Sequence, residues 1–215
     1  MHDFLLKLSI MLVPALLAVT LHEVAHGYAA ERCGDPTARL LGRLTLNPLR
    51  HLDPIGTLAL LLLGFGWARA VPVNPGNLRR TRQDMVLVAL AGPGANLALA
   101  IFCALCLRWG VALTGPGPSG GQDLQVGEPL MLMAAFGLYI NVILTLFNLL
   151  PIPPLDGGRI TVSLLPHHLA WRFARLEPFG FPILLVLLFT GILGAVLYPL
   201  VAGFMQLLAV LFGFY

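Results

Sequence analysis

Charged residues are scarce in this sequence. Only 11% of its 215 residues are Asp, Glu, Lys or Arg, whereas 58% are hydrophobic. A soluble domain of this length carries roughly a quarter charged residues, so a soluble globular protein is excluded. Alternating polar and apolar segments, which a membrane β-barrel needs, are also lacking. The long apolar runs that dominate the chain predict an all-α protein, a polytopic helical membrane bundle.

Cysteine is nearly as scarce, and the excess of positive charge is small. Cys33, Cys103 and Cys106 cannot form a disulfide framework. The last two make a C-x-x-C pair inside an apolar run, where small apolar fillers are favoured over a metal site. The net charge of +3 comes from clustered arginines. In a membrane protein such clusters are first topology signals, so we expect no nucleic-acid partner.

Four apolar runs are long enough to cross a bilayer, at residues 4–30, 85–107, 130–150 and 179–198. A signal peptide cleaved near residue 27 is disfavoured, because the first run is long for one. We expect one transmembrane domain over residues 1–215, without an internal repeat. Residues 199–215 follow a proline and could form a fifth span, a kinked continuation or an interfacial helix.

A shorter apolar run covers residues 55–67. As a helix it would be roughly 20 Å long, too short for a hydrocarbon core of about 30 Å. We therefore predict a re-entrant or interfacial segment between the first two full spans. The Gly- and Pro-rich residues 114–129 are expected to form a loop.

The distribution of arginine predicts the orientation. With the N-terminus external, the inner segments are residues 31–84 and 157–178. They hold eleven of the 13 Lys and Arg residues, namely Arg32, Arg39, Arg43, Arg50, Arg69, Arg79, Arg80, Arg82, Arg159, Arg172 and Arg175. This bias favours an external N-terminus.

Three polar side chains interrupt the first apolar run in "HEVAH", residues 22–26. His22 and His26 are four residues apart, so on a helix they share one face and can hold one zinc ion. Glu23 can reach a water on that ion, as in the H-E-x-x-H pattern of zinc proteases. The alternative is a polar cluster solvated at the inner end of the helix. Because a charged group in mid-bilayer costs about 2.5–3.5 kcal/mol, we favour the metal site.

A catalytic zinc requires a third protein ligand at the same depth. The third span runs inward and is followed by "PIPPLDGG", residues 151–158, in which Asp156 is the only acid. The prolines exclude regular helix. Irregular backbone at membrane depth is tolerated only where protein buries it or where it lines a cavity. Asp156 is therefore the predicted third ligand, and a turn formed with Gly157 is the alternative.

"HEVAHG" together with "NLLPIPPLDGGR" resembles the site-2 protease family, the intramembrane zinc metalloproteases of the M50 type. "GDPTARLLGRLTLNP", "DPIGT", "GWARAVPVNP" and "ALAGPGANL" extend the resemblance over residues 15–165. The family fold is a helical membrane bundle with three core spans. This chain resembles a short form, without the PDZ domain or the additional first span of many relatives.

The resemblance implies a role for each motif residue. His22, His26 and Asp156 would ligate one zinc ion per chain, and Glu23 would be the general base. Asn148 matches an asparagine that helps to position substrate or to stabilise the oxyanion, although it could simply cap its span. The implied substrate is a transmembrane peptide or protein in the lipid bilayer, cut near the cytoplasmic face. Such a substrate must be extended, and an edge near "GRLTLNP" or "AVPVNP" could pair with it.

Other polar residues are expected to have structural roles. Asn96 in the second span should hydrogen-bond to another helix rather than reach the active site, and Gly92 and Gly94 should allow close helix packing. His51 and Asp53 are expected to be solvated or interfacial.

Two other function classes remain as alternatives. A metal-binding or transport protein would carry inverted repeats and acids in several spans, and only one polar cluster is found. A proteolytically inactive adaptor is disfavoured, because Glu23 and all three expected ligands are present. The expected location is a cell membrane, multi-pass, on the family resemblance the bacterial inner membrane.

Overall fold

The computed structural model describes residues 2–63, 66–114 and 124–213. These residues form helices and no strand, apart from one isolated bridge between Leu52 and Ala68. The long helices are α1 (His2–Arg32), α4 (Thr81–Thr114), α5 (Leu124–Asn148) and α9 (Ile192–Phe212). The short α-helices are α2 (Thr37–Leu40), α3 (Pro54–Leu63), α6 (Asp156–Leu164), α7 (His167–Ala174) and α8 (Gly180–Phe189). Single 3-10 turns are η1 (Pro48–Arg50), η2 (Pro75–Asn77) and η3 (Glu177–Phe179).

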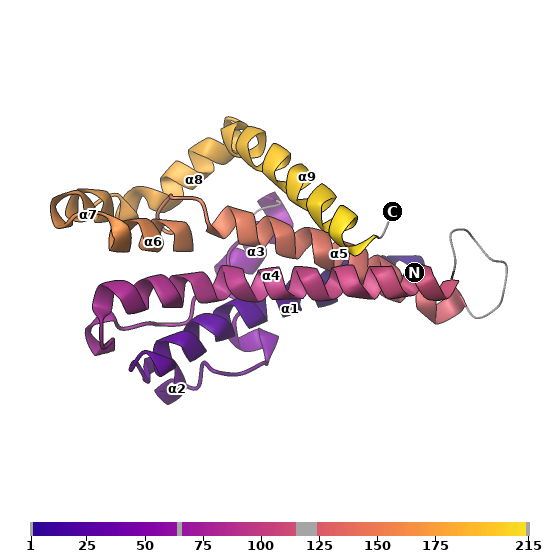
Figure 1. Ribbon diagram of the computed structural model, residues 1–215, viewed down its shortest axis with the longest axis horizontal. Coiled ribbons are helices and arrows are strands. Elements are labelled where there is room, and N and C mark those ends of the chain that lie inside the picture. The colour runs from indigo at the N-terminus through magenta and orange to yellow at the C-terminus, as the bar shows by residue number, and fades with distance from the viewer. Residues whose placement is uncertain (1, 64–65, 115–123, 214–215) are drawn as a thin grey trace.

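The long helices form a bundle. α1, α4 and α5 pack against one another along their length, and α9 lies across α4 and α5 (Figure 1). Among the described residues, four segments are long and apolar enough to cross a membrane, at Leu8–Arg32, Thr81–Gly110, Gly127–Asn148 and Ile192–Phe212. The prediction of an all-α, polytopic membrane bundle is therefore confirmed. α6 and α7 lie at the end of the bundle opposite the two chain termini (Figure 1).

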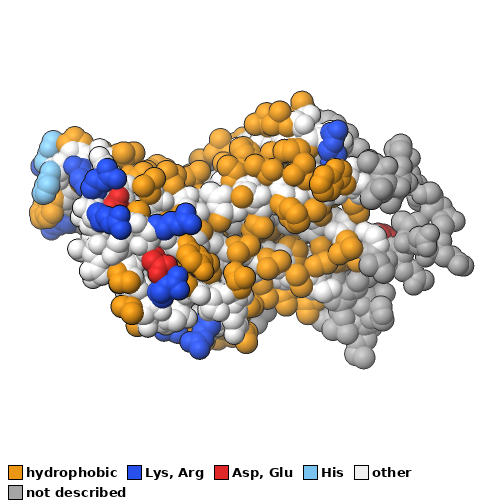
Figure 2. Space-filling model, turned by 60° about the horizontal axis from the view of Figure 1, so that its bottom comes forward, with side chains coloured by type: hydrophobic (Ala, Val, Ile, Leu, Met, Phe, Trp, Pro, Cys, Tyr) orange, Lys and Arg blue, Asp and Glu red, His pale blue; other side chains and the backbone are white. Residues whose placement is uncertain are grey.

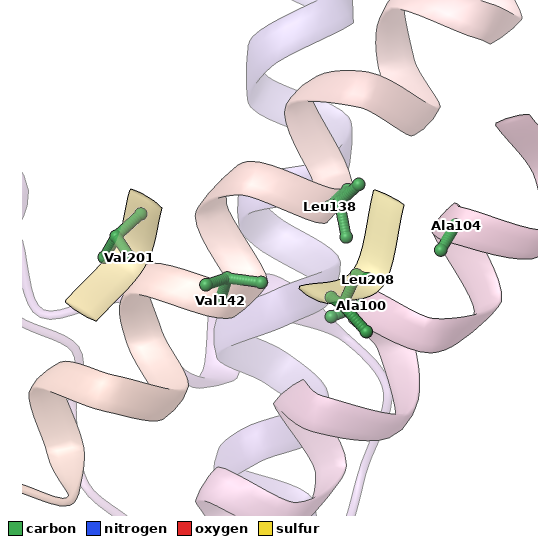
Figure 3. Close-up of a cluster of buried hydrophobic side chains, with 6 residues drawn as sticks. All are labelled: Ala100, Ala104, Leu138, Val142, Val201 and Leu208. Atoms are coloured by element: carbon green, nitrogen blue, oxygen red, sulfur yellow. The ribbon is translucent and has the colours of Figure 1, made fainter. Parts of the chain in front are cut away.

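A cluster of buried apolar side chains joins α4, α5 and α9 (Figure 3). Its members are Ala100, Ala104, Leu138, Val142, Val201 and Leu208. The two alanines in α4 are fully buried, and small residues of this kind let helix backbones approach closely in a membrane. This apolar cluster lies where α4, α5 and α9 pack together, and α4 and α5 continue toward the candidate site.

The end of the chain differs from the prediction of a span at residues 179–198. The structure breaks the helix after Phe189, because Gly191 has a φ of +76°, a left-handed conformation that favours glycine. The membrane-length helix is α9, which continues through Pro199. Proline is tolerated in membrane helices because neighbouring groups can satisfy the freed backbone carbonyl. The proline therefore did not mark the boundary, and the glycine did.

Other boundaries are shifted as well. α5 begins at Leu124, so it takes up part of the predicted loop 114–129, of which residues 115–123 lie outside the described residues. α4 extends beyond the predicted 85–107 at both ends. The ten-residue helix α3 begins one residue before the apolar run 55–67 and covers its first nine residues. Its re-entrant placement and the single-domain organisation stay predictions.

Candidate metal centre

His22, His26 and Asp156 lie together at one end of the bundle. The two histidines are one turn apart on α1, and Asp156 is the first residue of α6. Their Nε2 atoms are 3.1 Å apart, and the Asp156 Oδ2 atom lies 3.2 Å from His22 Nε2 and 3.1 Å from His26 Nε2. All three side chains are buried. The structure thus brings together the three residues that the sequence suggested as metal ligands.

The second nitrogen of each ring contacts an oxygen. His22 Nδ1 lies 2.6 Å from Asn96 Oδ1, and His26 Nδ1 lies 2.7 Å from the carbonyl oxygen of Val88. Because both partners are acceptors, both Nδ1 atoms must donate. In neutral rings, each Nε2 atom then presents a lone pair to the cluster. Partners of this type orient histidines that ligate metals.

The arrangement fits a small divalent cation. Three electron-pair donors meet within 3.2 Å of one another. In a tetrahedral zinc site with bonds of about 2.0–2.1 Å, two ligand atoms are roughly 3.3–3.4 Å apart. Asp156 Oδ2 is buried and has no hydrogen-bond partner among the described residues, despite its closeness to both rings. His22, His26 and Asp156 are also the one group in the described part of the chain with metal-ligand spacing.

The charge of Asp156 also suits a metal ligand. Burial by itself raises the pKa of its carboxyl, but His22 and His26 act the other way when their Nε2 atoms carry protons, and they then hold that pKa well below its usual value. Arg159 adds a more distant positive charge, with Nη1 at 3.9 Å from Asp156 Oδ1. Asp156 is therefore a carboxylate at neutral pH.

Two glycines allow the backbone to pack closely around the cluster, because a side chain at either position would clash. A Cβ atom on Gly92 of α4 would lie 2.3 Å from His26 Nε2 and 2.6 Å from His22 Cε1. Gly157 packs equally tightly, since a Cβ there would lie 2.2 Å from the carbonyl oxygen of Leu150. Gly94, in contrast, has no atom within 4 Å of its Cβ position. The expected close approach of α4 therefore depends on Gly92 and not on Gly94.

Glu23 is held from outside its helix. Its Oε2 atom accepts a hydrogen bond of 2.7 Å from the backbone N–H of Val71, in the non-helical segment before η2. Arg43, which is 8% exposed, supports that segment by donating through Nη2 to the carbonyl oxygen of Arg69 at 2.6 Å. Because Arg69 and Val71 are two residues apart, Arg43 indirectly fixes the partner of Glu23.

Asn148 ends α5, and the catalytic role that the family resemblance implies for it has less geometric support. Its Nδ2 atom donates to the carbonyl oxygen of Leu144, one turn back in the same helix, at 2.9 Å. This contact matches the capping alternative and does not place the amide on the histidine cluster. Its part in catalysis stays a prediction.

Some contributions were not apparent from the sequence. Asn96 was expected to link helices, and it does so by donating to Ala18 O at 3.2 Å and to Asn141 Oδ1 at 2.9 Å, but it also contacts His22. The sequence pointed to Asn96 because it is a polar residue within a predicted span. No local sequence pattern predicted that Arg43 would be buried. His51 is fully buried, with Nε2 2.8 Å from Thr45 O, so it is not solvated, and the interfacial alternative stays a prediction.

The fold and the cluster define a class, a multi-pass helical membrane protein with a candidate metal centre at one end of its bundle. Comparison with known proteins adds the family. The model for peptidase family M50 matches residues 119–191. "Putative zinc metalloprotease YwhC" of Bacillus subtilis (strain 168) is 41% identical over 192 residues, which are 88% of this chain and 84% of that protein.

Two further relatives are also named as zinc metalloproteases. "Putative zinc metalloprotease Rip2" of Mycolicibacterium smegmatis is 33% identical over 199 residues, 88% of this chain and 70% of that protein. "Putative zinc metalloprotease MJ0611" of Methanocaldococcus jannaschii is 36% identical over 81 residues, 37% of this chain and 35% of that protein. No solved structure matches. The chain belongs to peptidase family M50, the site-2 protease family.

Proposed function

We propose that this chain is an intramembrane zinc metalloendopeptidase. One zinc ion per chain would be held by His22 Nε2, His26 Nε2 and the Asp156 carboxylate. The observation that carries the proposal is the convergence of these three buried groups within 3.2 Å, with Glu23 next to the first of them in α1. The names of the M50 relatives, which describe them as zinc metalloproteases, support zinc as the metal.

The proposed chemistry is peptide hydrolysis by water. Zinc, when bound, would lower the pKa of water and polarise the scissile carbonyl. Glu23 accepts the proton of the attacking water and passes it to the leaving amine. The N–H of Val71 holds one carboxylate oxygen of Glu23, so the other is left to exchange the proton. Asn148 would position the substrate or donate to the developing oxyanion, a contribution of about 2.7–4 kcal/mol in other enzymes.

The proposed substrate is a transmembrane peptide or protein that unwinds at the cleavage site. A cavity of about 480 Å³ lies between residues 70–75 and the segment that contains Pro153, Leu155 and Arg159. This cavity adjoins both Val71, the partner of Glu23, and the residue before Asp156. An extended chain in it could pair with the backbone of "AVPVNP". If helix-breaking substitutions near the cleavage site leave the rate unchanged, unwinding is not required.

The arginine distribution supports an external N-terminus and cleavage near the cytoplasmic face. Figure 2 shows Lys and Arg side chains gathered at the end of the molecule where α6 and α7 lie in Figure 1. The candidate site is at this same end, because Asp156 begins α6. The proposed location is a cell membrane, the inner membrane in a bacterium.

The experiment compares purified wild type with Glu23→Ala and Asp156→Ala, in zinc content and in cleavage of a generic transmembrane peptide. We expect Glu23→Ala to keep zinc and lose cleavage, and Asp156→Ala to lose both. Glu128→Ala, at an exposed acid of α5, should match wild type. Zinc without cleavage in the wild type would favour a metal-binding or transport protein, or an inactive adaptor, and cleavage by Glu23→Ala would remove Glu23 as the base.

A further inference from the structure

The segment that follows Asp156 lies beside the ends of two helices that are long and apolar enough to cross a membrane. α6 and α7 connect the end of α5 at Asn148 to the apolar helix α8, which begins at Gly180. Arg82, in the first turn of α4, donates a hydrogen bond to the carbonyl oxygen of Leu165, between α6 and α7. The junction is therefore level with the ends of two spanning helices. The end of an apolar span marks the boundary between hydrocarbon and headgroups.

One face of α7 packs toward the protein and the other is exposed. Ala170, Phe173 and Ala174, spaced i, i+3 and i+4, are half-buried. The exposed side carries Arg172 and Arg175. Exposed apolar side chains flank these arginines, with Leu169 40% and Trp171 59% exposed within α7. Leu176 and Phe179 continue this apolar surface into η3.

The charge of this surface is positive. Residues 157–180 contain Arg159, Arg172 and Arg175 and a single acid, Glu177. The Arg175 guanidinium lies 4.7 Å from the centre of the Trp171 ring, so the aromatic ring and the cation form one exposed unit. A surface hollow of about 570 Å³ is lined by this pair together with Ala174, Glu177 and Pro178.

This combination favours one kind of partner. Free phosphate would satisfy the arginines and leave the apolar side chains in water. An uncharged membrane surface would accommodate tryptophan and leucine but would offer no net negative charge to the clustered arginines. Anionic phospholipid satisfies both, since basic residues gain about 1 kcal/mol each near such a surface and tryptophan prefers the interface.

We propose that the α7 surface, defined as Leu169, Trp171, Arg172, Arg175 and Leu176, binds the headgroups of anionic phospholipids in the leaflet that it faces. The arginines contact the phosphates, and the apolar side chains lie among the upper parts of the acyl chains. Because α6 carries Asp156 at its first residue and is followed directly by α7, this contact also anchors the segment that bears the third candidate ligand. The lipid site itself does not depend on the proposed proteolysis.

The test uses Trp171 as the reporter. In the full-length chain, Trp67→Phe and Trp109→Phe leave it as the single tryptophan. The protein is reconstituted in phosphatidylcholine vesicles that contain brominated phosphatidylglycerol or, at the same mole fraction, brominated phosphatidylcholine. We expect phosphatidylglycerol to associate with Trp171 several-fold more strongly, and high salt to remove the preference. A matched protein that keeps only Trp109, at the other end of the bundle, should show no preference.

Variants assign the preference to the arginines. Arg172→Gln and Arg175→Gln should each reduce the relative association of phosphatidylglycerol about fivefold, which corresponds to about 1 kcal/mol. Arg172→Lys and Arg175→Lys should retain the preference for phosphatidylglycerol. Arg108→Gln should have no effect on it, because Arg108 lies near the C-terminal end of α4 and donates to Phe212 O of α9, away from the α7 surface. Equal quenching by the two lipids, an unchanged preference in both Gln variants, or displacement of lipid by millimolar inorganic phosphate would overturn the proposal.

Discussion

Helix α4 serves two neighbouring regions with one stripe of small residues. Gly92, Asn96, Ala100 and Ala104 are each four residues apart, so they follow one another along the helix surface. The first two contact the histidines of α1, and the last two belong to the apolar cluster with α5 and α9. The same close approach of helices therefore supports a polar site in one region and purely apolar packing in the next.

The two regions differ in what their packing has to supply. In a bilayer, apolar side chains lose little when they exchange a protein neighbour for lipid, so the apolar cluster depends on shape. A buried polar group without a partner is costly, so each member of the polar region needs a particular atom opposite it. Asn96 illustrates this, because its side chain contacts His22, Ala18 and Asn141 at once. The polar region should therefore tolerate substitution far less.

The largest effect is expected from Gly92→Ala. The added methyl group would stand 2.3 Å from His26 Nε2, closer than real contacts allow, so the rings or α4 must move. We expect loss of nearly all bound zinc, measured as metal per purified chain. Gly94→Ala is the matched control, since its Cβ meets no atom within 4 Å, and it should bind zinc as wild type does. Full zinc occupancy in Gly92→Ala would show that the polar region is not rigid.

Asn96→Ala should have the next largest effect. It removes the acceptor of His22 Nδ1 and leaves Asn141 Oδ1 without its 2.9 Å donor. Loss of such outer partners typically lowers metal affinity 10–100-fold, which competition with a zinc chelator can measure. Thr145→Val removes a buried hydroxyl that donates to Asn141 O within α5 at 2.8 Å and lies 3.4 Å from Pro93 O of α4 but contacts neither histidine, and it should change zinc affinity less than twofold. Equal affinities for Asn96→Ala and wild type would contradict an orienting role.

The sequence predicted the parts of the site that short patterns carry. "HEVAH" places two imidazoles on one helical face whatever surrounds them, and the proline run stops α5 before Asp156. Which residue meets His22 Nδ1 depends on how α4 is rotated against α1, and no local pattern encodes that rotation. Arg43 is one of eight arginines from the end of α1 to the first turns of α4, and only tertiary packing distinguishes it. Likewise, the break at Gly191 rather than Pro199 depends on the conformation that the glycine adopts.

Arg43→Met tests the contact that supports Glu23 without touching the ligands. It removes the 2.6 Å hydrogen bond to Arg69 O, and charge-assisted hydrogen bonds are worth about 1.5–3 kcal/mol. We expect cleavage to fall about tenfold or more with zinc content unchanged, and Arg43→Lys to recover part of the activity. Arg50→Met, at an exposed arginine of the same segment between α1 and α4, is the control. Loss of zinc together with cleavage would mean that Arg43 holds the ligands as well.

The smallest effect on the site is expected from the apolar cluster. Leu138→Ala truncates a side chain that is 1% exposed and leaves a space between Ala100 and α9. In soluble cores such a change costs 2–5 kcal/mol, but part of that is transfer to water, which a helix still in lipid does not undergo. We expect a loss of about 1–2 kcal/mol in resistance to denaturing detergent, and zinc affinity within twofold of wild type. Leu132→Ala, on an exposed position of α5, should change neither quantity. If Leu138→Ala instead releases zinc, the apolar cluster sets the position of α4 at the histidines, and the two regions along that helix are one cooperative unit.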